Sequence, residues 1–519
     1  MEVRLAVLGV VLVGAALVPA SVPGAGVGAG GGIGDGVAQT AAPPDPSHDV
    51  LGWEQGYWYN ESIDVDQSDG LSEAELDAFV ARSMARVEVI RRREFRRDVP
   101  VSVVSRSAFR NRSQTDDATT PYGAWNNQVW EALFVVGEDT DVQRELQQTT
   151  GSAVAGFYSP ADDEIKIITP TPDSPTIDNA TLVHELTHAL QDQYVNLSDP
   201  RFSPPTQDAS LAADGLVEGE ANYVEHQYAR RCTGEWTCVR PPRGGGGGAE
   251  GPLNLGLLLT ILQPYSDGPP YVAHLRERGG WDALDYEHPP ASTEQVIHRV
   301  DEPPAPMSFE DRSNASWHLF PDQGVDGYDT VGEASVYMMF FEQSRNFGAG
   351  VVDVQAFFSP ESDLDLYDYT SKPSAGWGND RVYPYHRGNG SDAAYGYVWK
   401  TAWDTEADAE QFRAAYRKVL AAQDAERVGD GTWVVPDGPY ADAFHVARDG
   451  TTVTVVNAPT VGDLSGVRSS VDATNDTTND TTSPTGTTTD GMPGFTGATA
   501  LLAVGAALAA LVAARGWER

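Results

Sequence analysis

The sequence predicts an α+β fold built from two packed lobes. Between residues 154 and 168, two short β-prone runs flank a turn, which is typical of a β-hairpin. Residues 181–190 follow and combine apolar side chains with good helix formers. Apolar side chains recur at helical spacing in 333–343 and 407–420, and residues 444–456 indicate a closing hairpin. We therefore expect a small sheet with an edge strand and two helices, packed with a mainly helical C-terminal lobe that ends in a β-hairpin.

The chain before the first hairpin is expected to contribute two helices and a strand. Ser72 and Glu75 form a capping box, and apolar residues recur at helical spacing through residue 90. Residues 100–104 are rich in valine and indicate a strand, and residues 125–134 indicate another helix. These elements lead directly into the hairpin and the helix at 181–190.

The helix at 181–190 carries an H-E-x-x-H pattern, formed by His184, Glu185 and His188. Residues four apart lie one turn above each other, so both imidazoles can offer a nitrogen to one metal ion. Glu185 is rotated by about 100° from His184 and can reach a water on that metal from the side. The pattern therefore favours a Zn²⁺ site with an open position and a general base, and a chance match of a short pattern is the alternative.

A third protein ligand is expected on a second helix, around residues 216–223. Glu218 and Glu220 both lie there, and either carboxylate can complete a site with two histidines. Periodicity does not separate them, because the two flank the apolar face of the helix symmetrically.

Other polar residues are placed to support such a site. Asp192 follows His188 by one turn and Asn222 follows Glu218 by one turn, and a ligating imidazole usually donates its second N–H to a group of this kind. For Asp192, a solvated position on the helix surface is the alternative. The sequence does not choose among the candidates for stabilising an oxyanion, which are Tyr223, His226 and Tyr328.

The two ends of the chain have the composition of targeting segments. A short apolar run after Arg4 is followed by small residues up to Ala20, which is typical of a secretory signal peptide. Near the other end, the uncharged run from Ala498 to Ala514 would be about 25 Å long as a helix, nearly enough to span a bilayer core. The predicted regions are a signal peptide at 1–20, a low-complexity linker at 21–47, the metal-binding lobe at 48–270, the C-terminal lobe at 271–460, a Thr-rich stalk at 472–491 and a C-terminal signal with a transmembrane helix at 493–519.

The charge balance points to an unusual solvent. The formal net charge is −40, the pI is about 4.4, and lysine occurs only four times. Such a surface repels itself in dilute buffer, whereas at molar salt the screening length falls to about 3 Å. We expect a protein adapted to high salt, with an ordinary acidic secreted protein as the alternative. The acidity argues against nucleic acid and anionic lipid headgroups as partners.

Cysteines and glycosylation sequons agree with an extracellular body. Cys232 and Cys238 are the only cysteines, and their spacing suits a small disulfide-closed loop in an oxidising compartment. Sequons in the body of the chain predict glycosylation at Asn60, Asn111, Asn179, Asn196, Asn314 and Asn389.

Two stretches resemble parts of known zinc peptidases. The run H-E-L-T-H-A-L-Q-D at 184–192 resembles the active-site helix of thermolysin-like peptidases. The run E-G-E-A at 218–221 is similar to the E-G-x-A of the aminopeptidase branch. Together they resemble the gluzincins, in which a glutamate on a separate helix completes the zinc site. This resemblance implies a zincin-like core in which Zn²⁺ is held by His184, His188 and Glu218, with Glu185 as the catalytic base.

The C-terminus also resembles a known signal. The order Pro-Gly-Phe at 493–495, apolar helix and short basic end is similar to the sorting signal of surface proteins of halophilic archaea. The resemblance implies that an archaeosortase-like membrane enzyme removes the helix and attaches a lipid anchor. A plain C-terminal membrane helix is the alternative, and both place the body outside the cell.

These expectations combine into one functional hypothesis. We expect a secreted, surface-anchored zinc metallopeptidase that hydrolyses peptide or protein substrates with a zinc-bound water. The alternative is a non-catalytic envelope or adhesion protein that retains a zincin fold. The sequence does not distinguish an endopeptidase from an exopeptidase, and it gives no oligomeric state.

Overall fold

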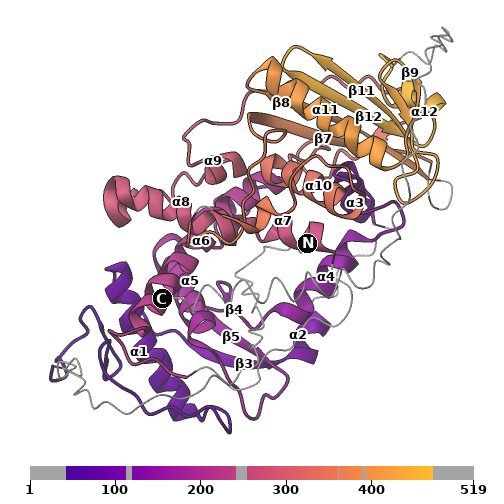
Figure 1. The fold of residues 1–519 in the computed structure, drawn as a ribbon. Coiled ribbons are helices and arrows are strands. Elements are labelled where there is room, and N and C mark those ends of the chain that lie inside the picture. Colours follow the sequence, from indigo (N-terminus) through magenta and orange to yellow (C-terminus); the bar gives the residue numbers. More distant parts are fainter. Residues whose placement is uncertain are drawn as a thin grey trace, which may run out of the picture.

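The computed structural model describes residues 43–112, 120–240, 254–360, 362–388, 390 and 393–471. It has an α+β fold of mixed helix and sheet, which confirms the predicted fold class. A small sheet lies at one end of the molecule and a large sheet at the other, with helices α6 to α10 between them (Figure 1).

The expected targeting segments lie outside the described residues. These are the signal peptide at 1–20, most of the linker at 21–47, the stalk at 472–491 and the C-terminal signal at 493–519. Within the ranges that the structure describes, no helix is long and apolar enough to cross a membrane.

The small sheet has the strand order β3–β5–β4. Strand β3 (Val101–Ser105) runs parallel to β5 (Glu164–Thr169), and β4 (Gly156–Ser159) pairs with β5 as the predicted hairpin. Helices α2 (Arg106–Arg112) and α4 (Val142–Ala153) belong to the connection between β3 and β4. Strand β4 is therefore a terminal strand of this sheet, and it lies next to the helix that follows the hairpin.

Three long helices pack around the small sheet. Helix α1 (Glu73–Arg91) begins with the predicted capping box, and α5 (Asn179–Val195) packs against α1, β4 and α6 (Gln207–Cys232). A hydrophobic core of residues from all three helices and the sheet surrounds α5, including Phe79, Ile165, Leu186 and Val224. The short strands β1 (Trp53–Glu54) and β2 (Tyr57–Trp58) pair beside α1.

The predicted lobe boundary at residue 270 falls inside a continuous helix. Helix α8 (Gln263–Gly279) packs along α6 and so belongs with the first lobe. Three more helices link the two ends of the molecule: α7 (Leu255–Ile261), α9 (Thr293–His298) and α10 (Gly332–Asn346). Short 3-10 turns occur at Pro200–Phe202, Gly280–Ala283 and Ala356–Phe358.

The prediction of a mainly helical C-terminal lobe is wrong. This lobe is built on a seven-stranded antiparallel sheet with the order β6–β7–β8–β12–β11–β10–β9. Its strands are β6 (His318–Leu319), β7 (Trp377–Arg387), β8 (Ala394–Trp403), β9 (Glu426–Gly429), β10 (Thr432–Val434), β11 (Ala443–Asp449) and β12 (Thr452–Ala458). Strand β7 contains glycine, asparagine, aspartate and proline, which are poor strand formers, so its propensity gives little signal.

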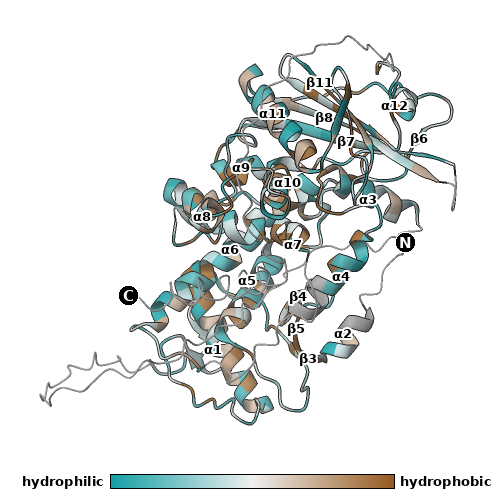
Figure 2. Ribbon diagram, turned by 45° about the vertical axis from the view of Figure 1, so that its right-hand side comes forward, coloured by the Kyte–Doolittle hydropathy of each residue, from teal (hydrophilic) through white to brown (hydrophobic). Residues whose placement is uncertain are grey.

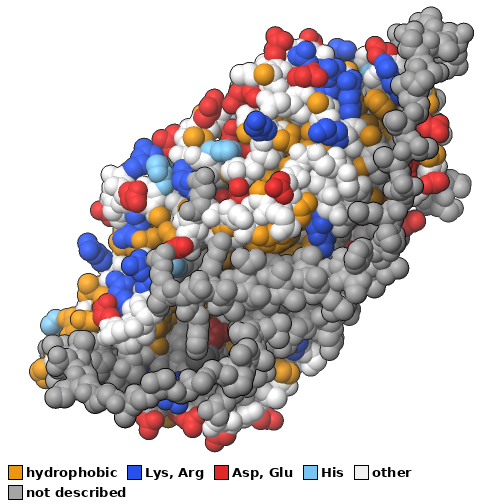
Figure 3. All heavy atoms as spheres, in the orientation of Figure 1, with side chains coloured by type: hydrophobic (Ala, Val, Ile, Leu, Met, Phe, Trp, Pro, Cys, Tyr) orange, Lys and Arg blue, Asp and Glu red, His pale blue; other side chains and the backbone are white. Residues whose placement is uncertain are grey.

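Helices cover both faces of the large sheet. Helices α3 (Pro121–Ala132), α10 and α11 (Glu406–Ala422) share one hydrophobic core with β7, β8, β11 and β12. Helix α12 (Val461–Val467) contributes to a second core with other residues of the same strands. The visible side of α11 is largely hydrophilic in Figure 2, as expected for a helix that buries Phe412 and Tyr416 on the sheet. Acidic side chains are scattered over the face seen in Figure 3 and gather into no single patch.

Candidate metal centre

Helix α5 places the H-E-x-x-H residues in the interior. The Asp178 side chain caps its first turn by accepting from Thr181 N at 2.9 Å, and Asn196 ends it in the left-handed conformation. His184 and Glu185 are fully buried, and His188 is 3% exposed. Buried polar groups of this kind need partners, and these come from α6 and β4.

His184, His188 and Glu218 converge on one point, and we call them the histidine triad. Nε2 of His184 lies 3.0 Å from Oε2 of Glu218, and Nε2 of His188 lies 3.2 Å from the same oxygen. The two Nε2 atoms are 3.0 Å apart. Donors around a tetrahedral zinc with bonds of about 2.0–2.1 Å are about 3.3 Å apart. The chemistry and spacing of these donors therefore fit Zn²⁺.

The electrostatics of the triad also suit a cation. Although burial raises the pKa of a carboxyl group, the facing imidazoles hold the pKa of Glu218 well below its ordinary value. Burial likewise opposes a charged imidazole, but hydrogen bonding to Glu218 raises the pKa of His184. The site thus favours a positive charge opposite Glu218, which a proton or a metal ion can supply.

Glu218, and not Glu220, faces the two imidazoles. Glu220 is turned toward α1, where one carboxylate oxygen accepts from Arg91 Nε and the other accepts from Gln191 Nε2 at 2.9 Å. Gln191 in turn places its Oε1 2.8 Å from His188 Nδ1. A buried chain of contacts therefore runs from His188 through Gln191 and Glu220 to Arg91.

Asp192 and Asn222, which were predicted to support the ligands, have other hydrogen-bond partners. Asp192 accepts hydrogen bonds from the Tyr158 hydroxyl at 2.9 Å and from Leu197 N at 2.7 Å, while the Asn222 amide donates to Tyr265 O at 3.3 Å. In the part of the chain that the structure describes, neither side chain hydrogen-bonds a histidine of the triad. One further position along a helix rotates a side chain by about 100°, so Asp192 faces the hairpin where Gln191 faces α6.

Two residues that were not predicted to support the ligands lie on the same helix faces as the ligands. Gln191 is three residues after His188, and this spacing also places two residues on one helix face. Glu225 is two turns after Glu218, and its Oε2 lies 3.6 Å from His184 Nδ1, beyond hydrogen-bonding distance. The ring of Tyr265, from α8, lies parallel to the His184 ring at a centroid distance of 6.1 Å, and no local pattern links the two.

Glu185 lies on the same helix with one oxygen held and one without a partner. Its Oε2 accepts from Tyr158 N of β4 at 2.7 Å, and its Oε1 has no hydrogen-bond partner among the described residues. Burial raises the pKa of Glu185 to about 7. A carboxylate with this pKa and one free oxygen can both accept and release a proton near neutral pH.

Among the described residues, none of the three oxyanion candidates has a hydrogen bond to the triad. The Tyr223 hydroxyl accepts from Arg276, and its ring packs on Trp281. Tyr328 packs on Tyr383 in the C-terminal lobe. For His226, burial and nearby Arg230 lower the pKa, and the structure gives it no contact with the histidines.

Helix α6 meets α8 through glycines beside the triad. A Cβ atom on Gly219 would lie 2.5 Å from the Gly268 backbone, which is closer than real contacts allow. The glycine after Glu218 therefore permits the close helix crossing that places Tyr265 near His184.

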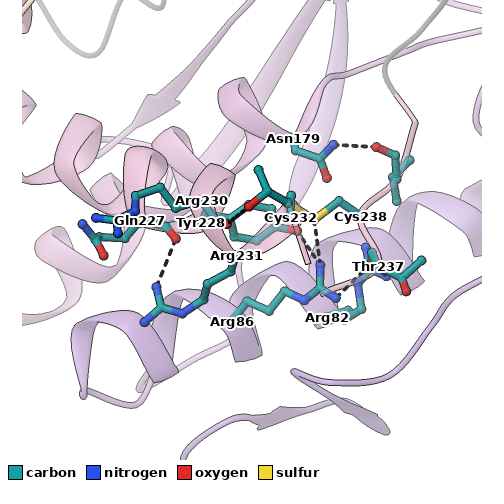
Figure 4. Close-up of a disulfide and its surroundings, with 12 residues drawn as sticks. Arg82, Arg86, Asn179, Gln227, Tyr228, Arg230, Arg231, Cys232, Thr237 and Cys238 are labelled. Atoms are coloured by element: carbon teal, nitrogen blue, oxygen red, sulfur yellow. Dashed lines mark hydrogen bonds between the residues drawn. A yellow bond between two sulfur atoms is a disulfide. The ribbon is translucent and has the colours of Figure 1, made fainter. Parts of the chain in front are cut away.

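The disulfide fixes the far end of α6. Cys232 and Cys238 are joined, with their Cα atoms 5.6 Å apart, and the loop between them lies against α1 (Figure 4). Arg82 and Arg86 both donate to Thr237 O, at 3.1 and 3.0 Å. The loop thereby ties the helix that carries Glu218 to α1.

The predicted sequons differ in their surroundings. Asn196 and Asn314 are exposed and Asn60 is partly buried, whereas the Asn179 amide nitrogen donates to Val239 O at 2.7 Å. An amide nitrogen engaged in this way is a poor acceptor for a glycan, which argues against the prediction at Asn179. The side chain of Asn111 and all of Asn389 lie outside what the structure describes.

Comparison with known proteins identifies one region only. A family model described as a domain of unknown function, DUF8575, matches residues 319–468, which span the large sheet with α10, α11 and α12. No curated protein and no solved structure matches the chain. The histidine triad lies outside the matched residues.

Proposed function

We propose that this chain is a zinc metallopeptidase of the gluzincin type, with a zincin-like core formed by the small sheet, α5 and α6. The observation that carries the proposal is the convergence of His184, His188 and Glu218 beside Glu185. Two imidazoles and one carboxylate form the ligand set of catalytic zinc sites, in which a further position stays open. A purely structural zinc site has four protein ligands, and the triad offers three.

His184, His188 and Glu218 would hold the metal. Zn²⁺, when bound, supplies a Lewis acid that polarises the scissile carbonyl and lowers the pKa of a water. Tyr158 N holds Glu185 by one oxygen, so that the other is free to take the proton from the attacking water. Glu185 then passes that proton to the leaving amine, as a general acid.

The edge of the small sheet supports a peptide as the substrate. Strand β4 is terminal in its sheet, and its residue Tyr158 bonds Glu185 directly. An extended peptide that adds to this edge gains backbone hydrogen bonds without strong sequence selection. The same edge therefore binds a substrate and orients the base.

The location of the enzyme rests on the sequence. The signal peptide, the stalk and the sorting signal imply secretion and attachment to the cell surface by a lipid anchor or a membrane helix. A net charge of −40 suits a working environment of high salt.

The test compares the native chain with Glu185→Gln in molar KCl. The amide keeps an acceptor for Tyr158 N but cannot take a proton, so hydrolysis of an unfolded protein substrate is expected to fall by about 10²–10⁴-fold. Zinc content, measured by mass spectrometry, is expected to stay at one ion per chain. Glu235→Gln, an exposed acid after α6, is the charge-matched control and should keep full activity.

Two results would contradict the proposed peptidase activity. Equal hydrolysis by the native chain and Glu185→Gln would remove the base from the mechanism. Bound zinc without hydrolysis in the native chain would favour the alternative, a non-catalytic surface protein with the same fold.

A further inference from the structure

A second group of carboxylates joins α3 to the large sheet, and we call it the acidic triad. Glu131 is in the last turn of α3, Glu138 is in the turn that follows, and Asp442 immediately precedes β11. One carboxylate oxygen of each lies within 4.8 Å of those of the other two. Glu131 and Asp442 are each 5% exposed, and Glu138 lies at the surface.

The backbone around the acidic triad is fixed without these side chains. Glu138 N donates to Pro439 O at 3.1 Å, and the Tyr440 hydroxyl donates to Phe134 O at 2.8 Å. A Cβ atom on Gly137 would lie 2.5 Å from Pro439, so glycine permits the close approach of the two segments. The fold therefore brings the three carboxylates together even though they repel one another.

Among the described residues, no positive side chain offsets this repulsion. Burial is the largest cause that raises the pKa of Glu131 well above its ordinary value, and it raises the pKa of Asp442 to about 8. The charged neighbours that act on these two groups are all acids, and they contribute to the rise of both pKa values. Buried carboxylates in such a cluster need either protons or a cation.

Within the described part of the chain, two buried amides bond to the triad, and each leaves its oxygen without a partner. Gln128 Nε2 lies 2.5 Å from Glu131 Oε2, and Asn457 Nδ2 lies 2.7 Å from Asp442 Oδ2. Gln128 is 6% exposed and Asn457 is fully buried, yet Oε1 of Gln128 and Oδ1 of Asn457 have no partner among the described residues. Turned over, each amide would aim its oxygen at the carboxylates, where either a protonated carboxyl or a cation can satisfy it.

We propose that Glu131, Glu138 and Asp442, with the amide oxygens of Gln128 and Asn457, bind one Ca²⁺ ion. Ca²⁺ takes six to eight oxygen ligands at about 2.3–2.6 Å, so ligands on opposite sides of the ion are about 4.8 Å apart. All five side chains offer oxygen, whereas zinc prefers nitrogen and sulfur. The exposed Glu138 gives the ion a way in from solvent. The bound ion clamps α3 to β11 and β12, and this role is independent of peptide hydrolysis.

The test titrates Ca²⁺ into the zinc-loaded full chain, freed of calcium, in molar KCl by isothermal titration calorimetry. Molar salt screens diffuse binding to the acidic surface. We expect one Ca²⁺ per chain and a rise in the thermal unfolding temperature. Glu138→Gln should weaken binding by at least about tenfold, because it removes one ligand charge at a position that solvent already reaches. Its zinc content should not change.

Asp437→Asn is the matched control, since this exposed acid lies in the loop before Asp442 and outside the acidic triad. It should bind Ca²⁺ like the native chain. Asp442→Asn should gain no thermal stability from Ca²⁺, but it should be at least as stable as the native chain without the ion. The proposal fails if the native chain takes up no Ca²⁺, if Glu138→Gln binds as tightly as the native chain, or if Asp437→Asn weakens binding equally.

Discussion

The histidine triad and the acidic triad solve the same electrostatic problem in different ways. In the histidine triad, one carboxylate faces two imidazoles, which hold the pKa of Glu218 well below its ordinary value. In the acidic triad, three carboxylates face one another, and the pKa of Asp442 rises to about 8. In the first cluster, protonated imidazoles can balance the charge of Glu218. The second cluster contains no basic group, so its negative charge is removed only by protonating the carboxyls or by adding a cation.

The two clusters also differ in what surrounds them. The histidine triad is backed by Gln191 and Glu220 and, at the end of the chain of contacts, by the buried Arg91. The acidic triad is backed by two amides with unpartnered oxygens. A chain of contacts that holds one histidine suits a site whose geometry is set for chemistry, and amides with unpartnered oxygens suit a site that the ligand itself finishes.

Among substitutions around the histidine triad, Glu220→Gln should cause the largest loss in the free energy of unfolding. The substitution leaves Arg91 buried without a carboxylate, and breaking a buried pair costs about 3–5 kcal/mol. Urea unfolding in molar KCl measures the loss. If Glu220 acts through this pair, the double variant Arg91→Met/Glu220→Leu should recover most of the stability.

Zinc content separates this structural effect from ligand loss. Glu220→Gln should still bind zinc, while Glu218→Gln should not retain it through dialysis. Zinc loss in Glu220→Gln with retention in Glu218→Gln would reverse the assignment of the two glutamates.

Gln191→Leu should have a smaller effect, on metal affinity. Gln191 holds Nδ1 of His188, and loss of such a contact typically weakens zinc binding by about 10–100-fold. Competition with a chromophoric chelator measures the change. Asp192→Asn is the neighbouring control and should leave zinc affinity within about twofold, because Asp192 contacts Tyr158 and Leu197 instead. Equal weakening by both variants would contradict this division of roles.

The two triads show what could be predicted from the sequence. His184, Glu185 and His188 lie within one turn of helix, so local spacing was enough to group them. Glu218 came from resemblance, since periodicity gave Glu220 the same standing. Gln191 was missed because a shift of one position changes the face of the helix.

The acidic triad has no local pattern at all. Glu131 and Asp442 come together only because α3 packs on the large sheet, and only the β11–β12 hairpin of that sheet was predicted. Neither β7 nor β8 alternates cleanly between buried and less buried residues, and β7 contains several poor strand formers, so alternation marks neither strand and propensity does not mark β7. Contacts that depend on an unpredicted sheet cannot be read from spacing.

A buried acid outside both triads, Asp208, is expected to have the smallest effect on stability, and this effect depends on pH. Asp208 lies at the start of α6, where Oδ1 accepts from Thr293 N at 2.8 Å and Oδ2 has no partner among the described residues. Burial, helped by nearby Asp380 and Glu333, raises its pKa from 3.8 to about 8. The folded chain therefore keeps a proton that the unfolded chain releases between about pH 4 and pH 8, so this contribution to stability is lost as the pH rises through that window.

Asp208→Asn should flatten the loss of stability between pH 5 and pH 8. One unit of pKa corresponds to about 1.4 kcal/mol, and we expect at least that difference between the native chain and the variant in urea unfolding at the two pH values. Asp208 belongs to no group of carboxylates close enough to share an ion. Saturating Ca²⁺ should therefore leave this pH dependence in place, while it removes the part due to the acidic triad. An equal pH dependence in the native chain and Asp208→Asn would show that Asp208 is not the group that holds this proton.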